Sequence, residues 1–287
     1  MPVVLPGHHC WQRPCCDGVD VVTWGQLQST QVNGATIGYR EAGHGPALVL
    51  LHGFLCDSRC WRPQAHLSDQ FRVVAWDAPG AGKSSDPPDT FTTADYVQCL
   101  AQFLDGIGIE RAHIVGLSWG GILAQEFYRQ VAGRVRSLVL ADTYAGWRGS
   151  LPEPVWKERL AACLQDAGAP PQTLVAKFLP SVFAHAARQD VRDEFADIVS
   201  QFHPVGFRLM SLSSAAVDTT DLLPRIAVPT LVLWGRDDRR SPLTVAEQLR
   251  AAIPGAKLEI IANAGHLSNM EQPDAFNAHI RRFCLSA

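Results

Sequence analysis

Short, largely apolar segments recur along the chain, and each is bounded by polar residues, glycine or proline. They occupy residues 47–51, 73–76, 113–115, 135–141, 230–234 and 258–261. Continuous apolar runs of this length are typical of strands covered on both faces, whereas half-exposed strands alternate apolar and polar positions. The pattern therefore predicts a buried sheet of mostly parallel strands.

Segments with helical periodicity lie between these runs. Residues 93–107 place their apolar side chains on one helical face, at Tyr96, Val97, Leu100, Phe103 and Leu104. Further helices are expected at residues 120–131, 243–253 and 273–283. Regular alternation of strands with helices predicts an α/β fold built on a doubly wound sheet.

The start of the organised chain carries a hairpin signal. Asn33-Gly34 stands between alternating residues at 31–37, and Asn-Gly is the preferred two-residue turn of a β-hairpin because both positions tolerate positive φ. We therefore expect an antiparallel hairpin at the N-terminal side of the sheet. Residues 1–27 show no such pattern, and we interpret them as an irregular extension.

One long segment departs from the alternation of strands and helices. Between residues 144 and 223 there is no buried-strand run, only helix-like stretches that contain Trp147, Trp156, Phe178, Phe183, Phe202 and Phe207. An aromatic helical insertion between two strands of such a sheet favours a lid over the ligand-binding edge. The predicted organisation is a core of residues 28–143 and 224–287, with a helical lid at 144–223.

The amino-acid composition argues against nucleic acid and membrane as partners of this protein. The 287 residues are 47% hydrophobic and 18% charged, and 25 basic against 28 acidic residues leave a net charge of −3. This balance argues against a nucleic-acid partner, because phosphate backbones require basic surfaces. Apolar runs stay far below the roughly 18 residues that cross a bilayer, and residues 1–6 lack the features of a signal peptide. We expect a cytoplasmic protein without a membrane partner.

The eight cysteines are scattered through a chain that is too large to need disulfide staples, which favours reduced thiols and the same compartment. Cys10, Cys15 and Cys16 lie near His8 and His9. Their spacing lacks a CxxC pair and a second ligand pair, so we assign this group no metal and no function.

The strongest chemical signal is Gly116-Leu117-Ser118-Trp119-Gly120. A Gly-x-Ser-x-Gly motif alone is weak, but here it follows a buried run and precedes an amphipathic helix, which is the setting of a nucleophile elbow. The glycines allow a turn so tight that larger side chains would collide, and the turn presents the serine hydroxyl above the sheet. Ser118 is the predicted nucleophile.

A serine hydroxyl needs a base, and the base needs an acid that holds its tautomer. His266 follows the last predicted strand, at the same carboxyl edge of the sheet as Ser118, and is the predicted base. Asp237 and Asp238 follow the run at 230–234, and Asp142 ends the run before it. Any of the three carboxylates satisfies this placement.

Backbone donors for an oxyanion are expected from two loops. The residue after the nucleophile, Trp119, supplies one N–H, and the loop that begins at His52 supplies the other, from Phe54. His52 itself is interpreted as a residue that braces this loop. The nearby Gly80-Ala81-Gly82-Lys83-Ser84 lacks the first glycine of a phosphate-binding loop, because Asp77 occupies that position, so nucleotide binding is not expected.

From about residue 32 to residue 283, these motifs together resemble the α/β-hydrolase superfamily. They comprise the His52-Gly53 loop, the Asp77-Ala78-Pro79-Gly80 loop, the elbow at Ser118, the Gly235-x-x-Asp238 acid and Gly265-His266. The resemblance implies an α/β-hydrolase fold with a helical lid, and the family spacing selects Asp238 as the acid. A serine at position 118, where dehalogenases and epoxide hydrolases carry aspartate, argues against both of those chemistries.

The closing segment, residues 264–273, resembles that of 3-oxoadipate enol-lactonases, whereas Ala78-Pro79 departs from their usual Asp-x-Arg-Gly loop. The resemblance implies a cofactor-free serine hydrolase that acts on a small carboxylic ester or lactone through an acyl-enzyme. The alternatives are a hydrolase of carbon–carbon bonds in ring-fission products, a cofactor-free perhydrolase, and a ligand receptor with little turnover. Trp119, Trp147 and Arg148 are candidate pocket residues, and a homo-oligomer is left open.

Overall fold

The computed structural model describes residues 24–287, and their strands form one eight-stranded sheet in the order β1-β2-β4-β3-β5-β6-β7-β8. The strands are β1 (Gln28–Val32), β2 (Ala35–Ala42), β3 (Ala47–Leu51), β4 (Arg72–Trp76), β5 (Ala112–Leu117), β6 (Val135–Ala141), β7 (Thr230–Gly235) and β8 (Lys257–Ile261). β2 is antiparallel to both β1 and β4, and the remaining neighbours are parallel. The predicted fold class is confirmed.

The central strands are buried because helices cover both faces of the sheet. Every residue of β3, β5 and β7 is buried, as their continuous apolar sequences predict. At the edge, Asn33 and Gly34 connect β1 to β2 with φ values of 49° and 82°. Both positions of this turn require positive φ, which explains the Asn-Gly pair.

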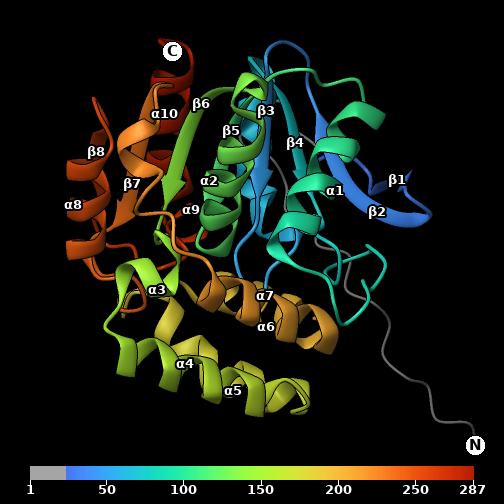
Figure 1. Ribbon diagram of the computed structural model, residues 1–287, viewed down its shortest axis with the longest axis vertical. Helices are drawn as coiled ribbons and strands as arrows, with labels where there is room; N and C mark the ends of the chain where they lie inside the picture. The colour runs from blue at the N-terminus through green and yellow to red at the C-terminus, as the bar shows by residue number, and fades with distance from the viewer. Residues whose placement is uncertain (1–23) are drawn as a thin grey trace, which may run out of the picture.

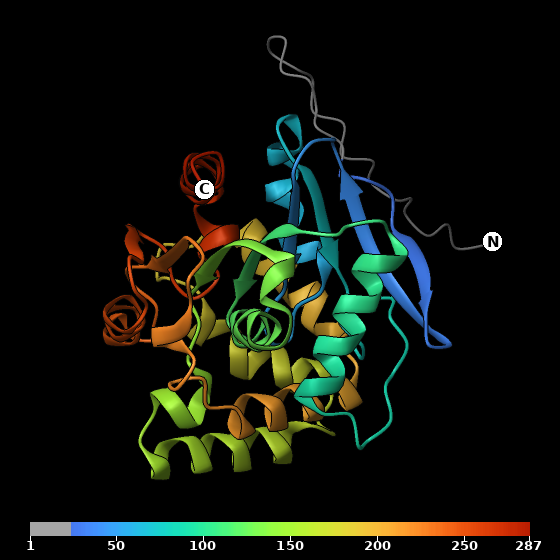
Figure 2. The same ribbon diagram turned by 45° about the horizontal axis from the view of Figure 1, so that its top comes forward.

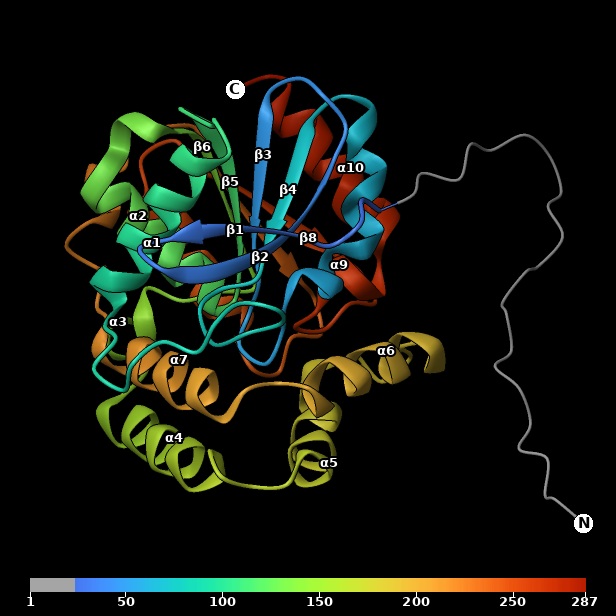
Figure 3. The same ribbon diagram turned by 90° about the vertical axis from the view of Figure 1, so that its right-hand side faces the viewer.

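Helices α1 (Thr93–Gly106) and α2 (Trp119–Val131) cover one face of the sheet, and η1 (Ser58–Asp69) with α10 (Pro273–Cys284) covers the other (Figure 3). Helix α8 (Leu243–Ala252) packs against β7 and β8. The α/β part of the chain also contains three short helices: η2 (Ala132–Arg134), η3 (Leu223–Arg225) and α9 (Ser268–Glu271). None of the helices between residues 24 and 287 is long and apolar enough to cross a membrane.

A separate helical layer is inserted between β6 and β7. It contains α3 (Gly146–Ser150), α4 (Glu153–Asp166), α5 (Pro171–Val182), α6 (Gln189–Ser200) and α7 (Pro204–Ala216). These helices lie together beyond the carboxyl ends of the parallel strands (Figures 1 and 2). We call this layer the lid. The predicted irregular extension lies outside the described residues, except for residues 24–27, which form neither helix nor strand.

Candidate active site

The turn between β5 and α2 places Ser118 at the carboxyl edge of the sheet. Its backbone has φ 53° and ψ −117°, a conformation that costs an L-residue roughly 1–3 kcal/mol. A Cβ atom on Gly116 would lie 2.4 Å from the Gly120 carbonyl oxygen, and one on Gly120 would lie 2.1 Å from the Leu51 carbonyl oxygen. The glycines are therefore required by the close approach of the turn, its helix and β3.

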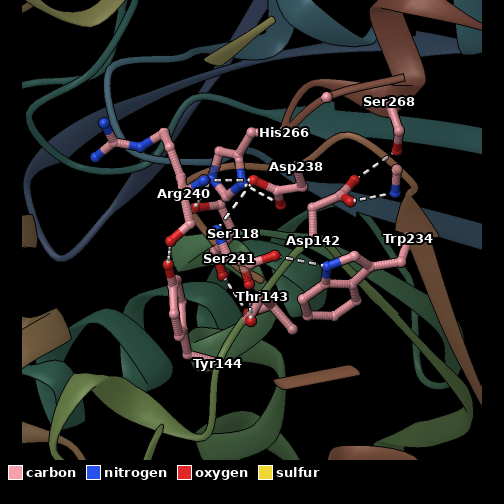
Figure 4. Close-up of polar contacts among 12 residues, drawn as sticks. Ser118, Asp142, Thr143, Tyr144, Trp234, Asp238, Arg240, Ser241, His266 and Ser268 are labelled. Atoms are coloured by element: carbon pink, nitrogen blue, oxygen red, sulfur yellow. Dashed lines mark hydrogen bonds and ion pairs between the residues drawn. The ribbon is translucent and has the colours of Figure 1, made fainter. Parts of the chain in front are cut away.

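Three side chains from distant parts of the chain are joined by hydrogen bonds (Figure 4). The Ser118 Oγ lies 2.9 Å from His266 Nε2, and His266 Nδ1 lies 2.7 Å from Asp238 Oδ2. Only 9% of Ser118, 4% of His266 and 7% of Asp238 is exposed, so the chain of bonds is largely shielded from water. With the Nδ1 proton donated to the carboxylate, Nε2 is left to accept the serine proton.

The loop after β7 fixes the carboxylate that meets His266. The other oxygen of Asp238, Oδ1, accepts the backbone N–H groups of Arg240 at 2.8 Å and Ser241 at 3.0 Å. The neighbouring Asp237 is exposed. Backbone geometry thus directs only the second aspartate of the pair toward the histidine.

Asp142 is buried beside this arrangement but bonds elsewhere. Its carboxylate accepts the backbone N–H of Gly235 at 2.7 Å and the hydroxyl of Ser268. Burial, reinforced by the negative charge of Asp238, raises the pKa of Asp142 well above its ordinary value. Asp142 therefore ties the end of β7 to the segment after His266, and Asp238 is the carboxylate that contacts His266.

The loop after β3 lies directly against the elbow. A Cβ atom on Gly53 would be 3.2 Å from the Ser118 Cβ, and Phe54 and Trp119 line one cavity with Ser118. His52 braces this loop, because its Nε2 accepts the Ala78 N–H at 3.0 Å and its Nδ1 donates to the Gly53 carbonyl at 2.8 Å. Burial lowers the pKa of His52, which favours this neutral form.

A partly open cavity lies over Ser118. Its apolar lining comes from both the core and the lid and includes Phe54, Trp119, Trp147, Phe178, Val182 and Phe195. Two basic side chains, Arg159 and Arg240, also line it. Arg148 does not: it is exposed and stacks over Trp156. The cavity thus contains the expected Trp147 but different arginines from the one that the sequence suggested.

Comparison with known proteins places this geometry in a family. The family model for the alpha/beta hydrolase fold matches residues 46–273. The chain belongs to that family. As an alpha/beta hydrolase, it carries Ser118, Asp238 and His266 in the order and at the strand ends that the sequence predicts.

Several curated and solved relatives resemble this alpha/beta hydrolase over most of their length. The 3-oxoadipate enol-lactonase 1 of Acinetobacter baylyi is 30% identical over 88% of this chain and 91% of its own. A 2-hydroxy-6-oxononadienedioate/2-hydroxy-6-oxononatrienedioate hydrolase of Burkholderia vietnamiensis is 31% identical over 85% and 89%. The structure of a thermophilic esterase from Thermogutta terrifontis superposes with a TM-score of 0.83 at 29% identity, covering 92% of this chain and 98% of the esterase.

Glu271 links the lid of this hydrolase to the histidine loop. Its carboxylate accepts the backbone N–H groups of Gly265 at 2.7 Å and Ala184 at 2.8 Å. The His266 N–H also donates to the Val182 carbonyl at 2.8 Å. Burial raises the pKa of Glu271 to about 7, although both N–H bonds act in the opposite direction. Sequence analysis missed this residue because a buried glutamate after the histidine loop has no local signature.

The glycine-rich segment that resembled a phosphate loop surrounds a carboxylate of its own chain. Asp77 accepts the backbone N–H groups of Ser58 and Lys83, each at 2.8 Å. A Cβ atom on Gly82 would lie 2.3 Å from the Asp77 carboxylate. Asp77 thus accepts the Lys83 N–H of this segment, while the N–H groups of Gly80, Ala81 and Ser84 donate to backbone carbonyls, and the segment is closed on its own chain.

Within residues 24–287, no group of three or more His, Cys, Asp or Glu side chains is placed to hold a metal ion. The cysteine and histidine group at residues 8–16 lies outside the described part of the chain. The described cysteines Cys56, Cys60, Cys99, Cys163 and Cys284 are unpaired and buried.

Proposed function

We propose that this alpha/beta hydrolase is a serine hydrolase that cleaves a small carboxylic ester or lactone through an acyl-enzyme on Ser118. The observation that carries the proposal is the continuous hydrogen-bonded chain from Ser118 through His266 to Asp238. A buried hydroxyl in contact with a base, itself oriented by a carboxylate, has the geometry of an activated nucleophile.

In the first half of the proposed reaction, the Ser118 oxygen attacks the substrate carbonyl while His266 Nε2 takes its proton. The carboxylate of Asp238 stabilises the imidazolium that forms. The backbone N–H groups of Phe54 and Trp119 hold the oxyanion of the tetrahedral intermediate. Collapse of that intermediate transfers the His266 proton to the departing alkoxide and leaves the acyl group on Ser118.

In the second half, water occupies the place of the alcohol. His266 removes a proton from this water, which attacks the acyl carbonyl through the same oxyanion site. Release of the acid regenerates the Ser118 hydroxyl. For a lactone, the alkoxide and the acyl group belong to one molecule, so the product of the cycle is a single hydroxy acid.

The similarity to both an enol-lactonase and a 2-hydroxy-6-oxononadienedioate/2-hydroxy-6-oxononatrienedioate hydrolase supports a second candidate reaction, the hydrolysis of a carbon–carbon bond. The same serine, histidine and aspartate can cleave a carbon–carbon bond beside a ketone in a ring-fission product. In that case, the leaving group is a carbanion equivalent, and His266 must deliver its proton to carbon.

A substrate panel tests the proposal. We expect steady multiple turnover of a p-nitrophenyl ester or a small lactone, and we expect S118A to lower kcat by roughly 10⁴-fold or more. Turnover confined to vinylogous diketones would replace the proposal with carbon–carbon hydrolysis, and turnover confined to acid with peroxide would indicate a perhydrolase. Binding without turnover would indicate a receptor. An S118A variant as active as the wild type would refute the nucleophile.

A further inference from the structure

Two arginine side chains, one from the core and one from the lid, line the cavity over Ser118. Arg240 belongs to the core, in the loop after β7, two residues beyond Asp238. Arg159 belongs to α4 of the lid. Figure 4 shows the Arg240 side chain on the side of His266 opposite Asp142. The cavity therefore offers positive charge beside the proposed nucleophile.

Within residues 24–287, neither guanidinium forms a salt bridge with a carboxylate. The Arg240 Nη1 donates to the Ser181 hydroxyl at 3.0 Å, and the guanidinium carbon lies 5.1 Å from the centroid of the Phe178 ring. These contacts orient the head group of Arg240 without pairing it with a carboxylate.

Arg159 is held in a similar way. Its Nη1 lies 3.0 Å from the Tyr144 hydroxyl, and its guanidinium carbon lies 5.4 Å from the Trp147 ring centroid. Its Nη2 approaches the Arg240 backbone carbonyl at 3.5 Å, which links the lid arginine to the core arginine's own loop. By contrast, Arg129 outside the cavity forms a bidentate pair with Asp221.

A half-buried guanidinium beside an apolar lining is costly, because the charge loses part of its water without gaining a paired anion. Burial lowers the pKa of Arg240 from its usual value, and the positive charge of Arg159 acts in the same direction. A guanidinium carries five N–H donors in a planar fork that matches a carboxylate, and most of these donors remain available on both residues. One anionic ligand group would relieve both arginines.

We propose that the substrate carries a carboxylate in addition to its ester or lactone bond, and that Arg240 and Arg159 bind this carboxylate while Ser118 attacks the carbonyl. The substrate class is then a half-ester or lactone of a dicarboxylic acid, with an apolar middle against the aromatic lining. This inference rests on the proposed function and specifies its substrate. Because one arginine belongs to the core and the other to the lid, the carboxylate also draws the lid onto the core.

Two esters that differ at one end test the proposal. The mono-p-nitrophenyl ester of glutaric acid and p-nitrophenyl pentanoate have acyl chains of the same length, and only the first ends in a carboxylate. We expect the wild-type protein to favour the glutarate ester in kcat/KM by about 10- to 100-fold, the usual worth of hydrogen bonds to a charged group. The R240Q and R159Q variants should each lower this ratio about tenfold, mainly through KM, and R240K should retain part of it.

The matched control is R148Q, because Arg148 is a lid arginine outside the cavity. We expect R148Q to keep the wild-type ratio. Equal kcat/KM for the two esters in the wild-type protein, or a ratio that R240Q and R159Q leave unchanged, overturns the carboxylate site. A ratio cancels losses from misfolding, since a partly folded preparation lowers both rates together.

Binding of monomethyl glutarate to S118A separates this inference from the proposed reaction, because this ligand keeps one ester and one free carboxylate. Calorimetry should detect monomethyl glutarate binding at least about tenfold tighter than methyl pentanoate, which has no carboxylate, with the difference lost in S118A/R240Q. If neither ester is turned over by the wild-type protein and this difference persists, the hydrolase fails while the carboxylate site stands. If both p-nitrophenyl esters are turned over and S118A binds monomethyl glutarate no better than methyl pentanoate, the site fails while the hydrolase stands.

Discussion

At the residue scale, position and protonation of a few buried groups determine the chemistry. Ser118 occupies a left-handed backbone conformation that its neighbours force upon it, and His266 reaches it at 2.9 Å. Sequence alone left three aspartates open at this site, and family spacing selected Asp238. The structure supplies the physical reason, since only this carboxylate is turned toward His266 by the N–H groups of Arg240 and Ser241.

Glu271 carries the clearest pH dependence among the buried acids. Its folded pKa of about 7 lies above the ordinary 4.5, so the folded protein holds this proton more tightly than the unfolded chain does. The resulting stabilisation is fully present below about pH 4.5 and is lost as the pH rises through about 7. We expect the free energy of unfolding of the wild type, relative to E271Q, to fall by about 1–3 kcal/mol across this window.

Chemical denaturation of both proteins between pH 4.5 and pH 8 measures this difference. The matched control is E158Q, which changes an exposed glutamate of the lid and should track the wild type at every pH. A difference between wild type and E271Q that stays constant with pH would show that folding does not raise the pKa of Glu271.

At the element scale, the buried strands and the turns that follow them were predictable, because parallel strands have continuous apolar sequences and the loops after them carry short motifs. The lid was predictable only as a helical insertion. Tertiary packing brings Arg159 of α4 and Arg240 of the loop after β7 into one cavity. No local sequence pattern distinguishes these two arginines from Arg148, which lies outside the cavity. Helix spacing alone cannot tell which face of a lid helix meets the core.

The junction of β3, β5 and α2 provides a test of how tightly these elements are packed. A methyl group at Gly120 would lie 2.1 Å from the Leu51 backbone carbonyl, which cannot move without disturbing the sheet. We expect G120A to lower the free energy of unfolding by about 1–3 kcal/mol, as overpacking does, and to reduce turnover. Gly133 has open space around its Cβ position, so G133A should leave both properties nearly unchanged. Thermal unfolding and ester turnover of the two variants measure these effects. If G133A destabilises the protein and slows turnover as much as G120A does, the close packing of the elbow is contradicted.

At the scale of the whole molecule, the lid and the core share one site. Val182 and Ala184 of the lid bond to the histidine loop directly and through Glu271, so this part of the lid also supports His266. Ser118 and His266 are largely shielded from water, and residues of both the core and the lid line the cavity over Ser118. The three residues lie on loops far apart in sequence, and the parallel sheet brings them together because its strand ends share one edge.

The central claim is that this meeting makes an ordinary serine hydroxyl reactive. A fluorophosphonate probe tests it most directly, since the probe labels serines that a neighbouring base activates. We expect one probe per chain on the peptide that contains Ser118, with labelling at least about 100-fold slower in H266A. Labelling at a different residue, or an equal rate in H266A, would contradict the account.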